Sequence, residues 1–165
     1  METIKLPFFG KISINKTLIE QDFQKYKKVN ESFVEFNLNF EPKNTSLKDL
    51  QILEHFLEDF QRQMDKADNA ISENYKQNGI AKEFVQIFVD ALRPLAKEVI
   101  LETLANGKSL EDYLFEDIEL AQVYSFPDDD GEFIKFTYQI TPELDEFLFI
   151  RFGKDLEVKE VGIEY

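Results

Sequence analysis

The sequence predicts an α+β fold with short N-terminal strands, one long and one kinked helix, and a C-terminal antiparallel meander. The main observation is that the apolar spacing changes from two residues to between three and four, and then returns to two. In addition, 17 Phe and 6 Tyr residues indicate an ordered core. We expect a single domain over 1–165, with N-terminal strands in 1–42, a helical region in 45–115 and an acidic antiparallel sheet in 117–165.

The N-terminal region contains the clearest single strand pattern. In FVEFNLNFEP, apolar residues alternate with polar residues from Val34 to Phe40, which is typical of a half-buried strand. Upstream, IKLPFFGKISI reads as one or two short strands that Pro7 and Gly10 interrupt. We expect a helix or loop containing Leu18, Phe23 and Tyr26 to join these strands.

A long amphipathic helix is predicted after Ser46. This residue and Asp49 resemble an N-terminal capping pair, and Asn78-Gly79 is a stop signal. The pattern allows one helix, or two helices broken near Asp68-Asn69. The apolar positions step by three and four residues: Leu50, Leu53, Leu57, Phe60, Met64, Ala67 and Ile71. We interpret this stripe as core, and a homodimer seam is the alternative.

A second helical stretch, IAKEFVQIFVDALRPLAKEVILETLANG, should be kinked or split by Pro94 and end at Asn106-Gly107. A short capped turn, SLEDYLF, follows it. The period then becomes two in IELAQVYSF, EFIKFTYQI, EFLFIRF and LEVKEVGIEY, which short turns separate. This pattern predicts an antiparallel meander of about four strands, with the helices packed on one face of the sheet.

Charge is the most informative global property. The net charge is −14, and residues 111–165 contain 16 carboxylates but only four Lys or Arg residues. Between Glu111 and Glu132 there are nine carboxylates and no basic residue. Such a surface disfavours nucleic acid and favours a basic protein partner. The candidate partner-binding residues are Glu116, Asp117, Glu119, Asp128, Asp129, Asp130 and Glu132.

The triplet in FPDDDGEF superficially suggests a calcium site. An EF-hand loop alternates its ligands and closes with Glu six residues after its Gly, where this chain has Thr137. Pro, Asp and Gly are typical turn residues, so we interpret the segment as a solvated turn that also belongs to an acidic recognition surface. On that interpretation, reversing these charges should leave thermal stability nearly unchanged or raise it.

Several chemistries are excluded by inventory. The chain has no Cys and a single His, His55, and it lacks phosphate-binding glycine loops and a nucleophile elbow. We interpret His55 as flanking the buried helical stripe, although a pair with Asp59 or a weak metal clip is conceivable. We therefore expect no enzyme activity, no cofactor and no metal site.

The first residues, METIKLPFFGKISINK, lack the apolar centre of a secretory signal, and no apolar run reaches the length of a membrane helix. We therefore expect a cytoplasmic protein without a membrane partner.

The C-terminal sequence IELAQVYSFPDDDGEFIKFTYQITPELDEFLFIRFGKDLEVKEVGIEY resembles the closing half of a family of small, acidic bacterial proteins that contain a domain of unknown function. The start, LPFFGKISI followed by VEFNLNFE, is similar to that family's start. The shared motifs are strand and turn signals without catalytic residues. Some family members are regarded as immunity proteins against secreted toxins, so the resemblance implies a role in toxin neutralisation.

Three functions are compatible with these observations. The first is a non-catalytic binding protein, such as an immunity factor, that uses an acidic surface against a basic partner. The second is a small ligand-binding domain or enzyme with a pocket between the sheet and the helices, where His55 or buried carboxylates are the polar groups. The third is a structural homodimer that uses the helical stripe.

Overall fold

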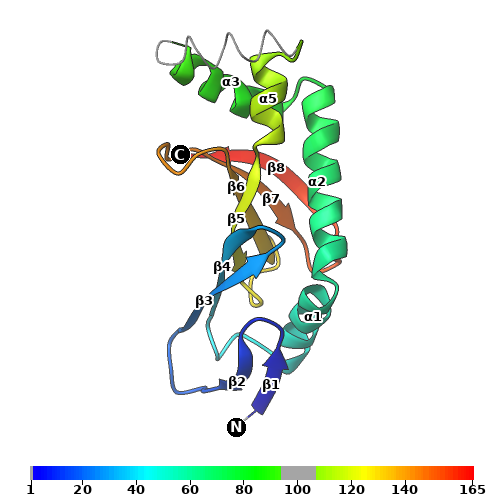
Figure 1. The fold of residues 1–165 in the computed structure, drawn as a ribbon. Helices are drawn as coiled ribbons and strands as arrows, with labels where there is room; N and C mark the ends of the chain where they lie inside the picture. The colour runs from blue at the N-terminus through cyan, green and yellow to red at the C-terminus, as the bar shows by residue number, and fades with distance from the viewer. Residues whose placement is uncertain (1, 94–106) are drawn as a thin grey trace.

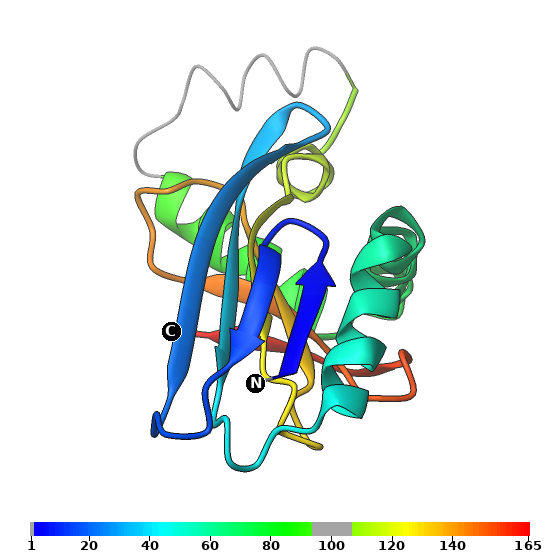
Figure 2. The ribbon, with the colours of Figure 1, turned by 90° about the horizontal axis from the view of Figure 1, so that it is seen from below.

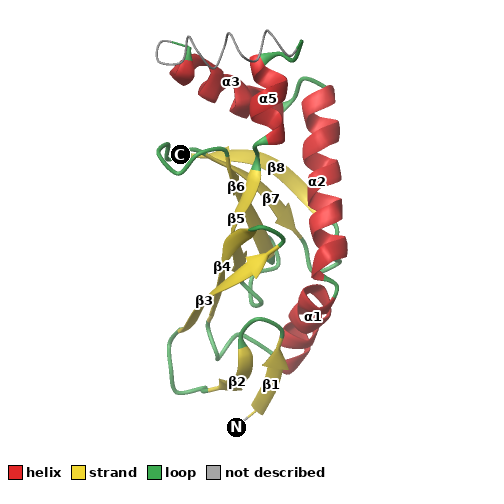
Figure 3. Cartoon of the chain, in the orientation of Figure 1, coloured by secondary structure: helices red, strands yellow, loops and turns green. Residues whose placement is uncertain are grey.

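The computed structural model describes residues 2–93 and 107–165 and confirms the α+β fold (Figures 1 and 3). The strands are β1 (Glu2–Leu6), β2 (Gly10–Ile14), β3 (Gln21–Val29), β4 (Ser32–Phe40), β5 (Glu119–Ser125), β6 (Ile134–Gln139), β7 (Phe147–Phe152) and β8 (Val158–Glu164). The helices of the described residues are α1 (Leu47–Glu58), α2 (Phe60–Lys76), α3 (Ile80–Leu92) and α5 (Leu110–Glu116).

Six strands form the main sheet in the order β3-β4-β5-β6-β7-β8, and β1 and β2 form a separate two-stranded sheet. Neighbours from β5 to β8 are antiparallel, which confirms the predicted meander. The β3–β4 hairpin joins the meander through a parallel pair between β4 and β5. A parallel neighbour requires a crossover connection, and the helical region between β4 and β5 supplies it.

The helices and the small hairpin cover one face of the main sheet. Helix α2 contacts β8, α3 contacts β7 and β8, and α1 contacts β1. Seen from below, the β1–β2 hairpin lies between the β3–β4 strands and α1 (Figure 2). The turn of this small hairpin places Phe8 against Phe36 of β4, with ring centroids 4.3 Å apart. The hairpin thus covers the end of the sheet that the helices leave open.

The predicted cap of the long helix is confirmed, but the position of its break is corrected. The Asp49 N–H donates to the Ser46 hydroxyl at 3.1 Å, and the Ser46 N–H donates back to the Asp49 carboxylate at 2.9 Å. The helix bends at Asp59, which separates α1 from α2, and it continues unbroken through Asp68-Asn69. Phe56 and Phe60 flank the bend and both reach the ring of Phe136, at 5.9 and 5.5 Å. The bend therefore follows the shape of the core.

The segment expected to be a helix or loop around Phe23 and Tyr26 is instead strand β3. It pairs with β4 along its whole length, from Gln21 opposite Phe40 to Val29 opposite Ser32. Pairing with a neighbouring strand overrides the weak local preference of this Lys-rich segment. Because β3 is an edge strand, its exposed lysines also protect the sheet from pairing with another chain.

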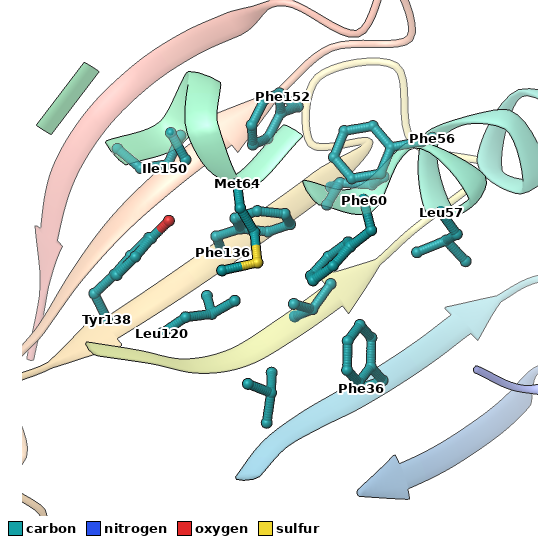
Figure 4. Packing of buried hydrophobic residues seen from close by; sticks show 14 of the residues in the cluster. Phe36, Phe56, Leu57, Phe60, Met64, Leu120, Phe136, Tyr138, Ile150 and Phe152 are labelled. Carbon is teal, nitrogen blue, oxygen red and sulfur yellow. The ribbon is translucent and has the colours of Figure 1, made fainter. Parts of the chain in front are cut away.

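The core combines residues from both strand groups and from the helices (Figure 4). Alternation in the strand segments and helical spacing place seven residues on inward faces, and all seven are buried: Val34, Phe36, Leu38, Phe60, Phe136, Tyr138 and Ile150. The whole apolar stripe from Leu50 to Ile71 is buried in the same cluster. The stripe is therefore occupied within the chain and is not exposed as a dimer seam.

The predicted kink at Pro94 and the stop at Asn106 lie outside the described residues. The Asn78-Gly79 stop is confirmed, because α2 ends at Lys76 and the Gly79 N–H donates to the Asn74 carbonyl at 2.8 Å. The short capped helix is also confirmed as α5, where the Asp112 N–H donates to the Ser109 hydroxyl. None of the helices in the described ranges is long and apolar enough to span a membrane.

Candidate binding pocket and acidic end

The structure divides the candidate partner-binding residues into two groups at opposite ends of β5. We define the acidic end as the carboxylates on and after α5: Glu111, Asp112, Glu116, Asp117 and Glu119. We define the acidic turn as the carboxylates between β5 and β6: Asp128, Asp129, Asp130 and Glu132. Strand β5 is seven residues long, so its two ends lie about 20 Å apart at roughly 3.3 Å per residue. The two groups therefore do not form one continuous patch.

The acidic turn is held by contacts within the fold. The Asp128 carboxylate accepts the backbone N–H of Glu41 at 2.9 Å, which ties the turn to the end of β4. The Asp129 carboxylate accepts the N–H groups of Gly131 and Glu132 at 2.8 and 3.0 Å. These bonds are typical of Asp in a turn. The turn that the sequence predicts is thus confirmed.

Three basic residues, Lys135, Arg151 and Lys154, neutralise much of the remaining charge of the acidic turn. Lys154 contacts both Asp130, at 2.7 Å, and Asp49 at the start of α1, at 2.9 Å. Burial would lower the pKa of Lys154, but the two carboxylates outweigh this effect and raise it. The Glu132 carboxylate lies 3.5 Å from the Lys135 ammonium and 3.7 Å from the Arg151 guanidinium. These contacts predict that charge reversal in the turn destabilises the protein, contrary to the expectation from the sequence alone.

The acidic end is more exposed and less compensated. Asp112, Glu116, Asp117 and Glu119 are all exposed, and in the described part of the chain Lys108 is the one basic residue that pairs with them, through Glu116. Tyr75 of α2 stacks on Phe115 of α5, with ring centroids 4.1 Å apart, and fixes the position of this helix. Burial, followed by the negative charges of Asp112 and Glu111, raises the pKa of Tyr75 to about 12. The acidic end therefore carries a negative field.

A small pocket opens beside the acidic end. It lies between the tip of the β3–β4 hairpin, α2 and the segment that leads into β5, and its volume is about 190 Å³. Val34, Met64 and Leu120 form its apolar wall, while Asp68 and Glu119 add carboxylates. A second hollow of similar volume shares Asp68 and extends toward α5. This is a pocket between the sheet and the helices, in the region that the ligand-binding hypothesis requires.

Asp68 and Tyr138 are the central polar groups of the pocket. Tyr138 of β6 is only 2% exposed, and its hydroxyl donates to the Asp68 carboxylate across a long 3.3 Å contact. Asp68 lies at the open rim and is exposed as a whole residue, but the surrounding protein partly buries its carboxylate. This burial raises the pKa of Asp68. Nearby Asp65 adds to this rise, whereas the Tyr138 hydrogen bond opposes it. The pocket therefore holds a carboxylate in an unfavourable setting for negative charge.

His55 lies away from this pocket, on the exposed side of α1, as expected for a residue that flanks the buried stripe. Within residues 2–93 and 107–165, no group of three or more His, Asp or Glu side chains is arranged to hold a metal ion.

The uncovered face of the sheet carries a separate polar network. Glu35 accepts hydrogen bonds from Gln24, Tyr26 and Asn37, each at 2.9 Å. Burial alone would raise the pKa of Glu35, but these hydrogen bonds outweigh it and lower the pKa. This carboxylate is satisfied by its neighbours, so the network stabilises the strand pairing and does not identify a ligand.

The sequence pattern does not identify Asp68 and Tyr138 as a site. A signal was present, because Asp68 follows Met64 by four residues and precedes Ile71 by three, which places a carboxylate at the edge of the apolar stripe. The contact with Tyr138 spans 70 residues of sequence and depends on how α2 lies across the sheet. Helical spacing therefore indicates the unusual carboxylate but not its partner.

Comparisons of this chain with protein-family models, with curated proteins and with solved structures found no match.

Proposed function

We propose that this protein is a non-catalytic binding protein of the cytoplasm that docks a basic protein on its acidic end. The observation that carries the proposal is the group of exposed carboxylates around α5, which one lysine in the described part of the chain compensates. Like charges that gather on one surface repel one another, and a positively charged partner relieves this repulsion. The resemblance to a family with immunity members makes a basic toxin domain the first partner to test.

The two groups of candidate residues contribute differently to this proposal. Glu116, Asp117 and Glu119 present their charges to solvent at the acidic end. Asp128, Asp129 and Glu132 of the acidic turn are bonded to backbone or paired with basic side chains. A carboxylate that is already paired attracts a second cation less strongly, so the acidic end is the primary docking surface.

A small ligand-binding domain is the second candidate function. The pocket between α2 and the sheet supports it, because Asp68 combines a concave position with a raised pKa. In this case the ligand would be a small cation, and a basic protein would not be required.

A capture experiment at low salt tests the first candidate. The protein is immobilised beside a variant that carries Glu116→Lys and Asp117→Lys, two exposed changes at the carboxyl end of α5, where Lys suits the helix dipole. A matched control carries Glu58→Lys and Glu143→Lys, which change the net charge equally at exposed positions elsewhere.

We expect a basic protein from the host to bind the wild-type protein and the control but not the acidic-end variant. Equal capture of the same partner by all three proteins would contradict docking at the acidic end.

A further inference from the structure

We propose that the pocket beside Asp68 receives a lysine or arginine side chain of the basic partner. This inference rests on the proposed function and adds a defined anchoring contact to it. The recognised chemistry is an alkyl stem that ends in a cation, and the source to which we commit is a side chain presented by a protein.

The size and walls of the pocket suit a single side chain. Its volume of about 190 Å³ is below the roughly 300–1,000 Å³ of pockets that bind drug-sized ligands. The side chains of Val34, Met64 and Leu120 form an apolar wall. Lys and Arg bury their methylene stems along such surfaces while their charged heads remain near polar groups.

The polar groups of the pocket suit a cation. Asp68 and Glu119 both line it, and within the described residues neither has a Lys or Arg nitrogen within 4.0 Å. Two uncompensated carboxylates around one hollow repel anions and attract cations. A partner ammonium or guanidinium group would supply the missing positive charge.

Tyr138 adds a hydrogen-bond acceptor to the lining of the pocket. Its hydroxyl is part of the pocket lining, although the residue is only 2% exposed. The hydroxyl donates to Asp68 at 3.3 Å, but among residues 2–93 and 107–165 no donor reaches its oxygen. A hydroxyl oxygen has two acceptor lone pairs, so this oxygen can accept a hydrogen bond in addition to the one that it donates. The N–H groups of an entering cation could therefore bond to both this oxygen and the Asp68 carboxylate.

The pocket is continuous with the acidic end, because Glu119 belongs to both. The exposed carboxylates around α5 would raise the local concentration of cations at the entrance. Ser32 of the β3–β4 hairpin donates to Glu119 at 3.2 Å, which holds this carboxylate at the hairpin tip. A basic protein docked on the acidic end therefore lies within reach of the pocket.

Side-chain mimics test the pocket without the partner. The ¹⁵N-labelled protein is titrated with n-butylammonium and n-butylguanidinium, and with butyrate as the anionic control, while amide chemical shifts are recorded. We expect at least one cation, but not butyrate, to cause saturable shifts at Ile118, Glu119 and Tyr138 with millimolar affinity. Chemical-shift changes that are spread along the acidic surface and do not saturate at the pocket residues would overturn the inference.

Three variants identify the groups responsible. Asp68→Asn keeps the acceptor for the Tyr138 hydroxyl and removes the charge, so we expect the mimic to bind about 10-fold more weakly. Tyr138→Phe removes the acceptor oxygen and should weaken binding by a smaller factor. Glu58→Gln removes an exposed charge from α1 and should leave binding unchanged. Equal affinities of the wild-type protein and the Asp68→Asn variant would contradict the inference.

The partner experiment separates this inference from the proposed function. If Asp68→Asn speeds dissociation of the basic protein about 10-fold and the acidic-end variant slows its association, both stand. If only the acidic-end variant has an effect, the pocket inference is wrong and the proposed function remains. If the mimic binds in the pocket but Asp68→Asn leaves the dissociation rate of the partner unchanged, the inference is wrong and the pocket is a site for small cations.

Discussion

Truncation of Phe36 tests how the two sheets and the helices share one core. Phe36 is fully buried on β4. The centroid of its ring lies 4.3 Å from that of Phe8, 5.3 Å from that of Phe60 and 6.5 Å from that of Phe9. Phe→Ala in a core costs about 3–5 kcal/mol, and each aromatic pair adds about 0.5–1.5 kcal/mol beyond its buried area. Because several ring contacts are lost together, we expect Phe36→Ala to lower the free energy of unfolding by about 4–5 kcal/mol.

Phe33 of the same strand is the matched control. It points to the opposite face of the sheet and is 74% exposed, so Phe33→Ala should change the stability by less than about 0.5 kcal/mol. Urea unfolding followed by circular dichroism gives both values, provided that the dependence on urea concentration is unchanged. A loss below about 1 kcal/mol for Phe36→Ala, or equal losses for the two variants, would refute the assignment of the buried strand face.

Two further predictions concern charged groups. Lys154→Met should cost about 1–2 kcal/mol at neutral pH, because it removes the partly buried contact with Asp49. Burial alone would raise the pKa of Asp49, but its hydrogen bonds and Lys154 outweigh this effect and lower it. The difference in the free energy of unfolding between variant and wild type should therefore shrink as the pH falls through that lowered pKa. A pH-independent difference would contradict this. Burial raises the folded-state pKa of Asp68. Ionisation of Asp68 therefore lowers the free energy of unfolding above that pKa, and it has no such effect below the unfolded-state pKa. Thermal unfolding should therefore show Asp68→Asn to be slightly more stable than wild type at pH 7, with the gain lost in acid, and a lower Tm at pH 7 would contradict the reasoning.

The sequence predicts the fold well where one face of an element is buried. Alternation places Val34 and Phe36 on the core side of β4, and helical spacing places the stripe from Leu50 to Ile71 in the core. Strand β3 lacks this signal because it is an edge strand, and Lys25, Lys27 and Lys28 are exposed. Its conformation is determined by pairing with β4, which the local sequence does not encode.

The bend at Asp59 and the arrangement of the carboxylates depend on three-dimensional packing. Neither Gly nor Pro occurs at the bend, so the usual sequence signals of a break are missing. In the sequence, Glu119 and Asp128 belong to one acidic stretch, but strand β5 carries them apart and gives them different neighbours. Lys154 reaches the acidic turn from 24 residues further along the chain and is recognised as its partner only in the fold.

The most direct test of the central claim is the association rate of the basic partner at low ionic strength. If the acidic end steers docking, the variant with Glu116→Lys and Asp117→Lys should associate about 10-fold more slowly than wild type, and much more slowly than the Glu58→Lys and Glu143→Lys control. The difference should shrink near 0.15 M salt, where the screening length falls to about 8 Å. An association rate for the acidic-end variant that equals the wild-type rate, or slowing of the same size in the control, would contradict docking at the acidic end.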